Sequence, residues 1–154
     1  MINRRMLRAA MLTTLATAGT IAVNAPAAYA AQAQAVRAAT AVRWANGQVG
    51  DPYRWGGAGP HSFDCSGLTM YVWRRAGVKL PHNAAGQYRA VRTKVSWRNL
   101  KPGDLMLLYG YGHVGIYVGG GRWVHAPGKG RPVRKESIHG WVRSKFNGAV
   151  RPGM

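Results

Sequence analysis

Apolar residues in the first half of the chain recur at the spacing of α-helices. The first predicted helix covers residues 32–49, an Ala-rich stretch whose apolar positions at helical spacing are Val36, Ala39, Val42 and Val49. Residues 50–60 are dense in Gly and Pro and are predicted to form a loop.

A second predicted helix runs from Asp64 to Ala76. Asp64 can cap its first turn, because a side-chain oxygen there accepts a hydrogen bond from a free backbone N–H. Gly77 is typical of a helix end, since glycine readily adopts the left-handed conformation found there. The apolar side chains expected to be buried are Leu68, Val72 and Ala76. A short third helix is predicted over 81–91.

The second half of the chain changes to the pattern of strands. The turn at 101–104 leads into an apolar strand at 105–109. Two further apolar runs, 114–118 and 122–126, are joined by Gly119–Gly121, which predicts a hairpin. Two or three more strands are expected in the basic C-terminal segment. Helices first and antiparallel strands after them predict an α+β fold.

Residues 1–30 have the features of a signal peptide. Three arginines precede an uncharged stretch, Ala9–Val23, and Ala28–Ala30 supplies the small-x-small pattern of a cleavage site. A membrane anchor is the alternative, although the stretch is short and rich in Ala and Thr. Cleavage after Ala30 would leave residues 31–154, which suit one domain.

The chain is strongly basic, with 22 Lys and Arg against 4 Asp and Glu, and without the three leader arginines the formal charge is +15. This charge predicts an anionic partner. Export would take the protein away from nucleic acid, so anionic cell-wall polymers are expected and nucleic acid is not. The charge could also serve solubility alone. We expected the tail residues Arg131, Arg134 and Lys135 to bind the wall without taking part in chemistry.

Cys65 is the only cysteine. It cannot form an internal disulfide, and a free thiol outside the cell is liable to oxidation, so it is either reactive or buried and inert. Its position at the start of a predicted helix favours reactivity, because the helix dipole and free N–H groups stabilise a thiolate and can bind an oxyanion. Asp64 opposes the thiolate, so a His partner is expected.

The chain has five His. His61, His82 and His139 lie in loop-like sequence and are interpreted as solvated surface residues. His113 and His125 lie on the two predicted hairpin strands. Facing one another, they could serve with Cys65 as base, orienting group and nucleophile.

Whether the two His share a face depends on the hairpin loop. A three-residue loop at Gly119–Gly121 would pair Gly115 with His125 and make His113 its diagonal neighbour, about 5–8 Å away. A two-residue loop, or a bulge, would put the two His on opposite faces. Three consecutive Gly favour the longer loop. A metal site of one Cys and two His is the competing interpretation, but no close pair of ligands supports it, and we expect no metal and no cofactor.

Six short runs occur in one order along the chain: Gly50–Gly57 (GDPYRWGG), Phe63–Leu68 (FDCSGL), Leu80-Pro81 with Gln87, Leu100–Leu105 (LKPGDL), His113–Gly119 (HVGIYVG) and Val124–Ala126 (VHA). Together they resemble the NlpC/P60 family over about residues 36–152. The resemblance implies a papain-like fold, in which the helix that carries the nucleophile packs against a small antiparallel sheet. It also implies cleavage of peptidoglycan stem peptides, often between D-glutamate and the diamino acid.

The resemblance assigns roles by motif. Cys65 would be the nucleophile, His113 the base and His125 the orienting residue. Tyr53 would border the active site, and Asp64 and Ser66 would line the pocket for the amino end of the stem peptide.

One departure from the family pattern concerns the groove. Many relatives carry Arg and then Ser or Thr after Leu80-Pro81, whereas this chain has His82 and Asn83. The expected protein is thus a secreted, monomeric thiol peptidase of the cell wall without a stable membrane anchor. The alternatives are an amidase or acyltransferase of related fold, and a non-catalytic cationic wall-binding protein.

Overall fold

Helices precede strands along the chain, as the apolar spacing predicts, in a computed structural model that describes residues 25–154. The elements are α1 (Ala25–Gly47), α2 (Cys65–Arg75), α3 (Ala84–Ala90), β1 (Lys94–Val95), the 3₁₀ turn η1 (Trp97–Asn99), β2 (Leu105–Leu108), β3 (His113–Gly119), β4 (Arg122–His125), β5 (Arg134–Ser137), α4 (Trp141–Lys145) and β6 (Phe146–Val150). The α+β prediction is confirmed.

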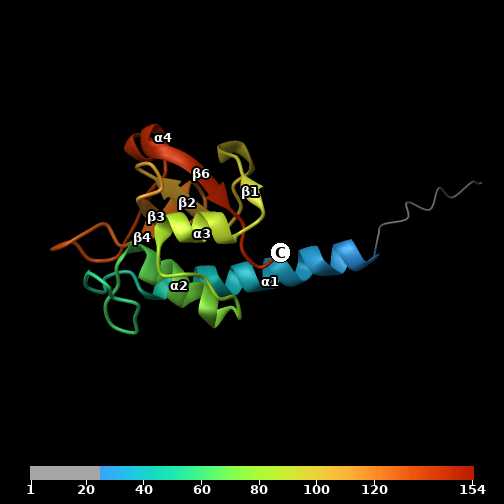
Figure 1. Ribbon diagram of the computed structural model, residues 1–154, viewed down its shortest axis with the longest axis horizontal. Helices are drawn as coiled ribbons and strands as arrows, with labels where there is room; N and C mark the ends of the chain where they lie inside the picture. The colour runs from blue at the N-terminus through green and yellow to red at the C-terminus, as the bar shows by residue number, and fades with distance from the viewer. Residues whose placement is uncertain (1–24) are drawn as a thin grey trace, which may run out of the picture.

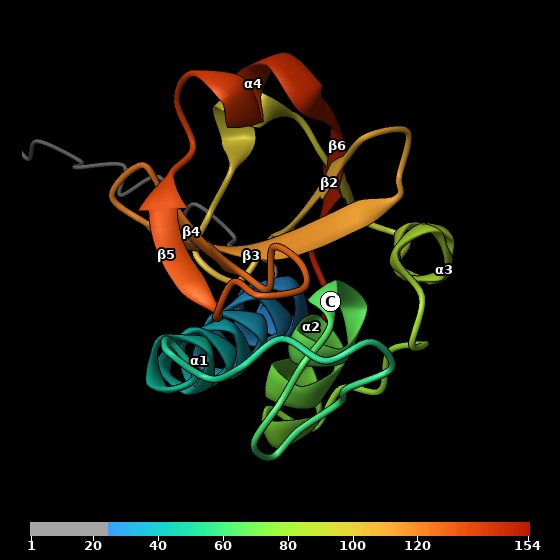
Figure 2. The same ribbon diagram turned by 90° about the vertical axis from the view of Figure 1, so that its left-hand side faces the viewer.

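The six strands form one antiparallel sheet in the order β1-β6-β2-β3-β4-β5. Helices α1 and α2 lie together under one face of this sheet, and α4 lies on its other side (Figure 1, Figure 2). Alternate side chains of β3 therefore face different surroundings. Val114 and Ile116 belong to the core between the sheet and helices α1 and α2. On the opposite face, Trp123 of β4 packs with Val142 of α4.

The first helix differs from its prediction in extent, since it begins before residue 32 and ends at Gly47. Its buried residues are Gln34, Ala38, Ala41 and Ala45. Val36, one of the apolar positions at helical spacing, is 63% exposed. The helix lies very close to the rest of the domain, since a Cβ placed on Gly103 would come within 2.7 Å of the Ala38 methyl. The small side chain of Ala38 and the lack of one at Gly103 permit this close approach, and Val42 packs against the same core.

The predicted leader lies largely outside the described residues. Only residues 25–30 of it are described, as the exposed first turns of α1, and the first buried residue of the helix is Gln34. Among the described residues, cleavage after Ala30 would thus remove only exposed ones. Within the described residues, no helix is long and apolar enough to span a membrane.

Most of the other predicted elements are present. Asp64 caps α2 as predicted, and Gly77 follows the helix with a φ of +83°. The expected strands in the C-terminal segment are two, β5 and β6, and they are separated by the unpredicted short helix α4.

Candidate active site

Cys65 is the first residue of α2, and the loop before it is tied to the helix by the Asp64 carboxylate. The backbone N–H of Gly67 donates to Asp64 Oδ1 over 2.7 Å, and the N–H of Gly56 donates to Oδ2 over 2.9 Å. The backbone N–H of Val114, the residue after His113, is close enough to the Cys65 sulfur to lower the pKa of its thiol, although burial raises that pKa more. The thiol therefore lies where α2 begins and against the start of β3.

The entrance of α2 is in direct contact with the preceding loop. A Cβ on Gly67 would lie 1.9 Å from the carbonyl oxygen of Gly57, and that carbonyl also accepts the N–H of Asp64 over 2.9 Å. The expectation that Gly67 permits a close approach is confirmed, and the approaching group is the chain's own backbone.

The thiol does not have the lowered pKa that its helix position predicted. Burial raises the pKa of the Cys65 thiol, the negative Asp64 raises it further, and the N–H groups of Val114, Ser66 and Cys65 itself only partly oppose this. Loss of water around a partly buried thiolate outweighs the hydrogen bonds at the helix start. The resting nucleophile is therefore a neutral thiol.

The two strand histidines face one another. His113 Nε2 lies 2.9 Å from His125 Nδ1. The hairpin reaches this arrangement by a route we did not predict. Gly119 pairs with Arg122 across a two-residue loop, and the register then shifts so that Tyr117 pairs with Trp123. The two-residue loop and the bulge each move the side chains of β4 to the other face of the sheet. Together they return His125 to the face that carries His113.

An acidic residue that the sequence did not single out completes this row of side chains. Glu136 Oε2 lies 3.0 Å from His125 Nε2, and Glu136 forms an ion pair with Arg134, whose Nε lies 2.6 Å from Glu136 Oε1. Glu136 reaches His125 from β5, the edge strand, which pairs with β4. Since this contact depends on sheet pairing between distant positions, no local motif indicated it.

Both rings are neutral at ordinary pH. Burial, the neighbouring His125 and the positive Arg131 lower the pKa of His113 to about 4. Burial and the positive charges of Arg134 and Arg131 lower the pKa of His125 to about 3. The contact between His125 and Glu136 is therefore a hydrogen bond from a neutral ring and not an ion pair.

Trp123 and Gly115 fix the position of the His125 ring. The Trp123 and His125 rings stack at 4.2 Å with an interplanar angle of 17°. A Cβ on Gly115 would lie 2.4 Å from the indole of Trp123 and 2.9 Å from His125 Cβ. Glycine at this position lets both rings lie flat across β3.

Two cavities adjoin these residues. A cavity of about 430 Å³ is lined by Tyr53, Asp64, Cys65 and Ser66, among others, so the structure gathers the four predicted site residues of the loop and helix around one space. Tyr53 lies close to Cys65 and Asp64, since burial and the negative charge that each of these two residues carries when ionised raise the pKa of its phenol. A second cavity, of about 370 Å³, is lined by residues from β3 onward: Tyr109, His113, His125, Pro127, Arg131, Glu136 and Trp141.

His82 is exposed, as interpreted from the sequence, and it also contacts the candidate site, which the sequence did not indicate. Its Nε2 lies 2.8 Å from Asp64 Oδ1, and its ring lines the Cys65 cavity. Asn83 beside it caps α3 by accepting from the N–H of Gly86. The two residues that depart from the family pattern thus shape one wall of this cavity.

Gln87 connects the start of α2 to the loop before α3, a role that the sequence did not indicate. It is fully buried, and its amide nitrogen donates to the carbonyls of Ser66 and Pro81, while its oxygen accepts from Thr69. The start of α2 is thereby fixed against the loop that carries His82.

Two of the three tail residues that we expect to bind the wall lie beside the candidate site. Arg131 lines the cavity of the two histidines, and Arg134 binds the carboxylate that holds His125. Lys135, the third residue of that set, is exposed.

The competing metal interpretation finds no ligand set within residues 25–154, where no three or more His, Cys, Asp or Glu side chains are grouped so as to hold an ion.

Sequence comparison matches residues 50–151 to the NlpC/P60 family. The chain is similar to the probable endopeptidase p60 of Listeria innocua, with 46% identity over 101 residues, which are 64% of this chain and 21% of the relative. A probable endopeptidase of Mycobacterium tuberculosis is 46% identical over 88 residues, 56% of this chain and 23% of the relative. The chain thus spans about a fifth of the length of these curated relatives.

Solved structures show the same fold. An NlpC/P60 family protein from Bacillus cereus superposes with a TM-score of 0.69 at 29% identity, covering 74% of this chain and 39% of that one. The NlpC/p60 domain of the peptidoglycan hydrolase SagA superposes with a TM-score of 0.65 at 37% identity, covering 73% of this chain and 97% of that domain.

Proposed function

The chain belongs to the NlpC/P60 family, and from this premise we propose that it is an exported cysteine endopeptidase that hydrolyses amide bonds in peptidoglycan stem peptides. The observation that carries the proposal is the thiol of Cys65 at the start of α2, next to the strand that bears His113. The relatives named probable endopeptidases and the solved domain of a peptidoglycan hydrolase support it. We assign the cut to the bond between D-glutamate and the diamino acid.

The reaction follows from a neutral thiol beside a neutral imidazole. His113 accepts the thiol proton as the Cys65 sulfur attacks the scissile carbonyl carbon. The carbonyl oxygen becomes an oxyanion, for which the N–H groups of Cys65 and Ser66, close to the sulfur, are candidate donors. Collapse breaks the C–N bond, and His113 returns the proton to the leaving amine.

Water completes the cycle. It attacks the thioester carbon and gives one proton to His113, and breaking the C–S bond releases the carboxylic acid. The thiolate then regains its proton from His113. His125 orients His113 throughout, and Tyr53, Asp64 and Ser66 border the space that the stem peptide would enter.

Digestion of purified cell-wall sacculi, with the released peptides identified by mass spectrometry, tests this proposal. Wild type should release fragments that end in D-glutamate. Cys65→Ala should release none, and Cys65→Ser almost none, because a hydroxyl is a far weaker nucleophile beside this base. Circular dichroism checks that both variants fold. Activity of Cys65→Ala within about tenfold of wild type would contradict a covalent role for Cys65. Loss of the nucleophile should cost more than this, since a positioned acid–base group by itself contributes about 10²–10⁴-fold.

Reagents separate the thiol mechanism from its metal rival. Alkylation of the single thiol should abolish release, whereas a chelator should leave it unchanged. Loss of activity on chelation, with protection of the thiol by bound metal, would instead favour a metal site.

Export is a separate part of the proposal and rests on the leader pattern in residues 1–30. N-terminal sequencing of protein recovered outside the cell should give Ala31 as the first residue. An intact N-terminus in a membrane fraction would favour the anchor alternative.

A further inference from the structure

We infer that Glu136 is a positioning residue that sets the tautomers of both His125 and His113 and so makes His113 the base. This inference rests on the proposed function for its catalytic meaning and on geometry for the tautomers. The row of contacts runs from Arg134 through Glu136 and His125 to His113, across strands β5, β4 and β3.

The argument starts at the carboxylate. An ionised carboxylate only accepts hydrogen bonds. Glu136 Oε2 lies 3.0 Å from His125 Nε2, so this ring nitrogen must carry the proton. Arg134 forms an ion pair with the other oxygen, with 2.6 Å between its Nε and Glu136 Oε1, and this positive charge favours the ionised carboxylate that only accepts.

The proton on His125 Nε2 determines the next bond. A neutral imidazole carries a proton on one nitrogen only, so His125 Nδ1 has a free lone pair. That atom lies 2.9 Å from His113 Nε2, which must therefore be the donor. His113 Nδ1 is then left with the lone pair. A general base needs such a lone pair. If the protons were instead on His125 Nδ1 and His113 Nδ1, the lone pair of His125 Nε2 would face the Glu136 carboxylate, and two acceptors would repel one another.

The groups around His125 leave no other residue to set this order. From β5 it faces Arg134 and Glu136, from β3 His113, from the following loop Arg131, and from α4 the uncharged Trp141. Arginine side chains have donors but no acceptor. Glu136 is therefore the acceptor that fixes the direction of the row.

The inference can be tested on the wild-type protein without a variant. Long-range ¹H–¹⁵N correlation spectra at neutral pH distinguish a protonated from a bare ring nitrogen. We expect His125 and His113 both as the Nε2–H tautomer. A His125 ring protonated on Nδ1, or doubly protonated, would overturn the inference whether or not the protein cleaves peptidoglycan.

A variant then tests the link to catalysis. Glu136→Gln keeps the side-chain shape, but its amide can donate as well as accept, so both tautomers of His125 should be populated. We expect kcat on a soluble stem peptide to fall about 10–100-fold, the size of loss found when the hydrogen-bond partner behind a metal-bound His is removed, while KM stays close to wild type. Lys135→Gln is the matched control, since it makes the same kind of change on the same strand outside the row.

The outcomes separate the two proposals. Unchanged tautomers and unchanged kcat in Glu136→Gln would show that Glu136 is not the determinant. A wild type with the expected tautomers but no cleavage would contradict the proposed function and leave the tautomer assignment intact.

Discussion

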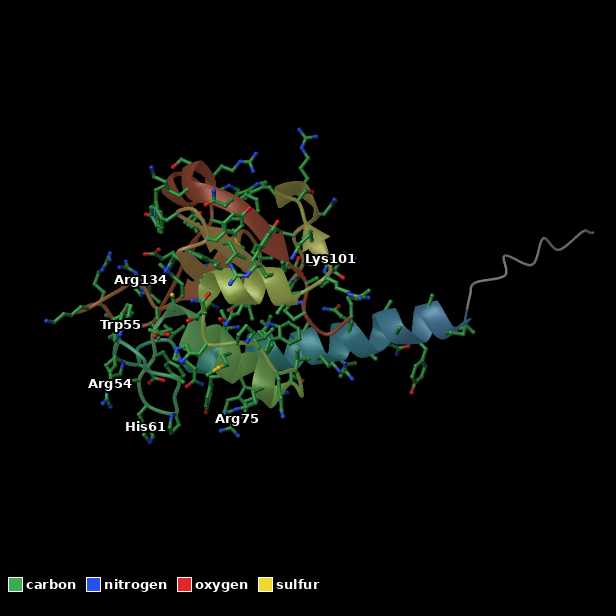
Figure 3. The ribbon with its side chains drawn as sticks, viewed as in Figure 1. Arg54, Trp55, His61, Arg75, Lys101 and Arg134 are labelled. Carbon is green, nitrogen blue, oxygen red and sulfur yellow. The ribbon has the colours of Figure 1, made fainter. Side chains whose placement is uncertain are left out.

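The site combines one thiol and two imidazoles, and all three side chains are neutral at rest. In the proposed mechanism His113 accepts the proton and His125 orients the His113 ring, whereas His61 is exposed in a loop and points away from the domain (Figure 3). The three histidines can therefore be compared directly by the same substitution.

We expect His113→Ala to lower kcat by about 10²–10⁴-fold, the usual contribution of a positioned base. His125→Ala should cost less, because its ring does not itself exchange a proton with substrate. His61→Ala should match wild type. Peptide release from sacculi and turnover of a soluble stem peptide measure all three. A larger loss from His61→Ala than from His113→Ala would show that the base is misplaced.

The acid side of the pH profile depends on His113. Burial lowers its pKa to about 4, so the ring remains a free base down to that pH. Activity should be lost as pH falls through about 4, whereas an unperturbed His would already lose it near about 6.5. We would measure kcat/KM on a soluble peptide from pH 7 downward, with circular dichroism at each point to exclude unfolding. A half-point near pH 6.5 would show that His113 is solvated in the working enzyme.

At the scale of elements, the site depends on how closely loops and strands approach one another. Helix α2 can begin where it does because Gly67 has no side chain to meet the Gly57 carbonyl. Asp64 then binds both the loop and the helix. The position of the thiol is therefore determined by a backbone contact as much as by a cap.

Gly67→Ala tests this contact. The added methyl would lie 1.9 Å from a backbone oxygen, so the loop or the helix start must move. We expect a fall in the midpoint of thermal unfolding together with a loss of activity that exceeds tenfold, since small misplacements of reacting groups cost about 10²-fold. Gly47→Ala is the control, because a Cβ there meets nothing within 4 Å. Full activity in Gly67→Ala would mean that the entrance of α2 is pliable.

Elements with local signals could be predicted from the sequence, whereas contacts between distant elements could not. Asp64 caps α2 because capping depends on the next three residues, which are adjacent in the chain. Glu136 and Gln87 reach the site only through sheet pairing and helix packing. The exposure of Val36 and the burial of Gln34 depend on which side of α1 meets the rest of the domain, and apolar spacing along the helix does not specify this.

At the scale of the whole molecule, the few carboxylates have specific positions within a basic surface. Of the chain's four acidic residues, Asp64 ties the α2 entrance, Glu136 holds His125, and Asp104 binds Arg151 through both oxygens. The basic side chains, by contrast, are distributed widely. Figure 3 shows Lys101 and Arg75 on sides of the domain away from Arg134.

This distribution changes which residues should test wall binding. Arg98 and Lys101 line a cavity at the β1 edge, outside both cavities of the site. Changing both to Gln should weaken retention on intact walls and leave turnover of a soluble peptide unchanged. Arg131→Gln should instead alter turnover, because Arg131 faces the two histidines.

Salt provides the matching physical test of a charge-driven partner. Exposed charges are screened over about 8 Å at physiological ionic strength. Raising salt should release the protein from walls rich in anionic polymer and should affect the soluble substrate much less. Retention that ignores salt would mean a specific receptor and would leave the basic surface without this role.

The number of residues in the hairpin between β3 and β4 determines which face of the sheet each side chain of β4 occupies. The two-residue loop and the one extra residue at the bulge together put His125 on the same face as His113. Deleting one residue there would turn His125 toward the helices and bring Val124 to the active face. Deleting two would restore the parity. The number of residues in this run therefore determines which face His125 occupies, and glycine suits the run because Gly119, Gly120 and Gly121 all have positive φ.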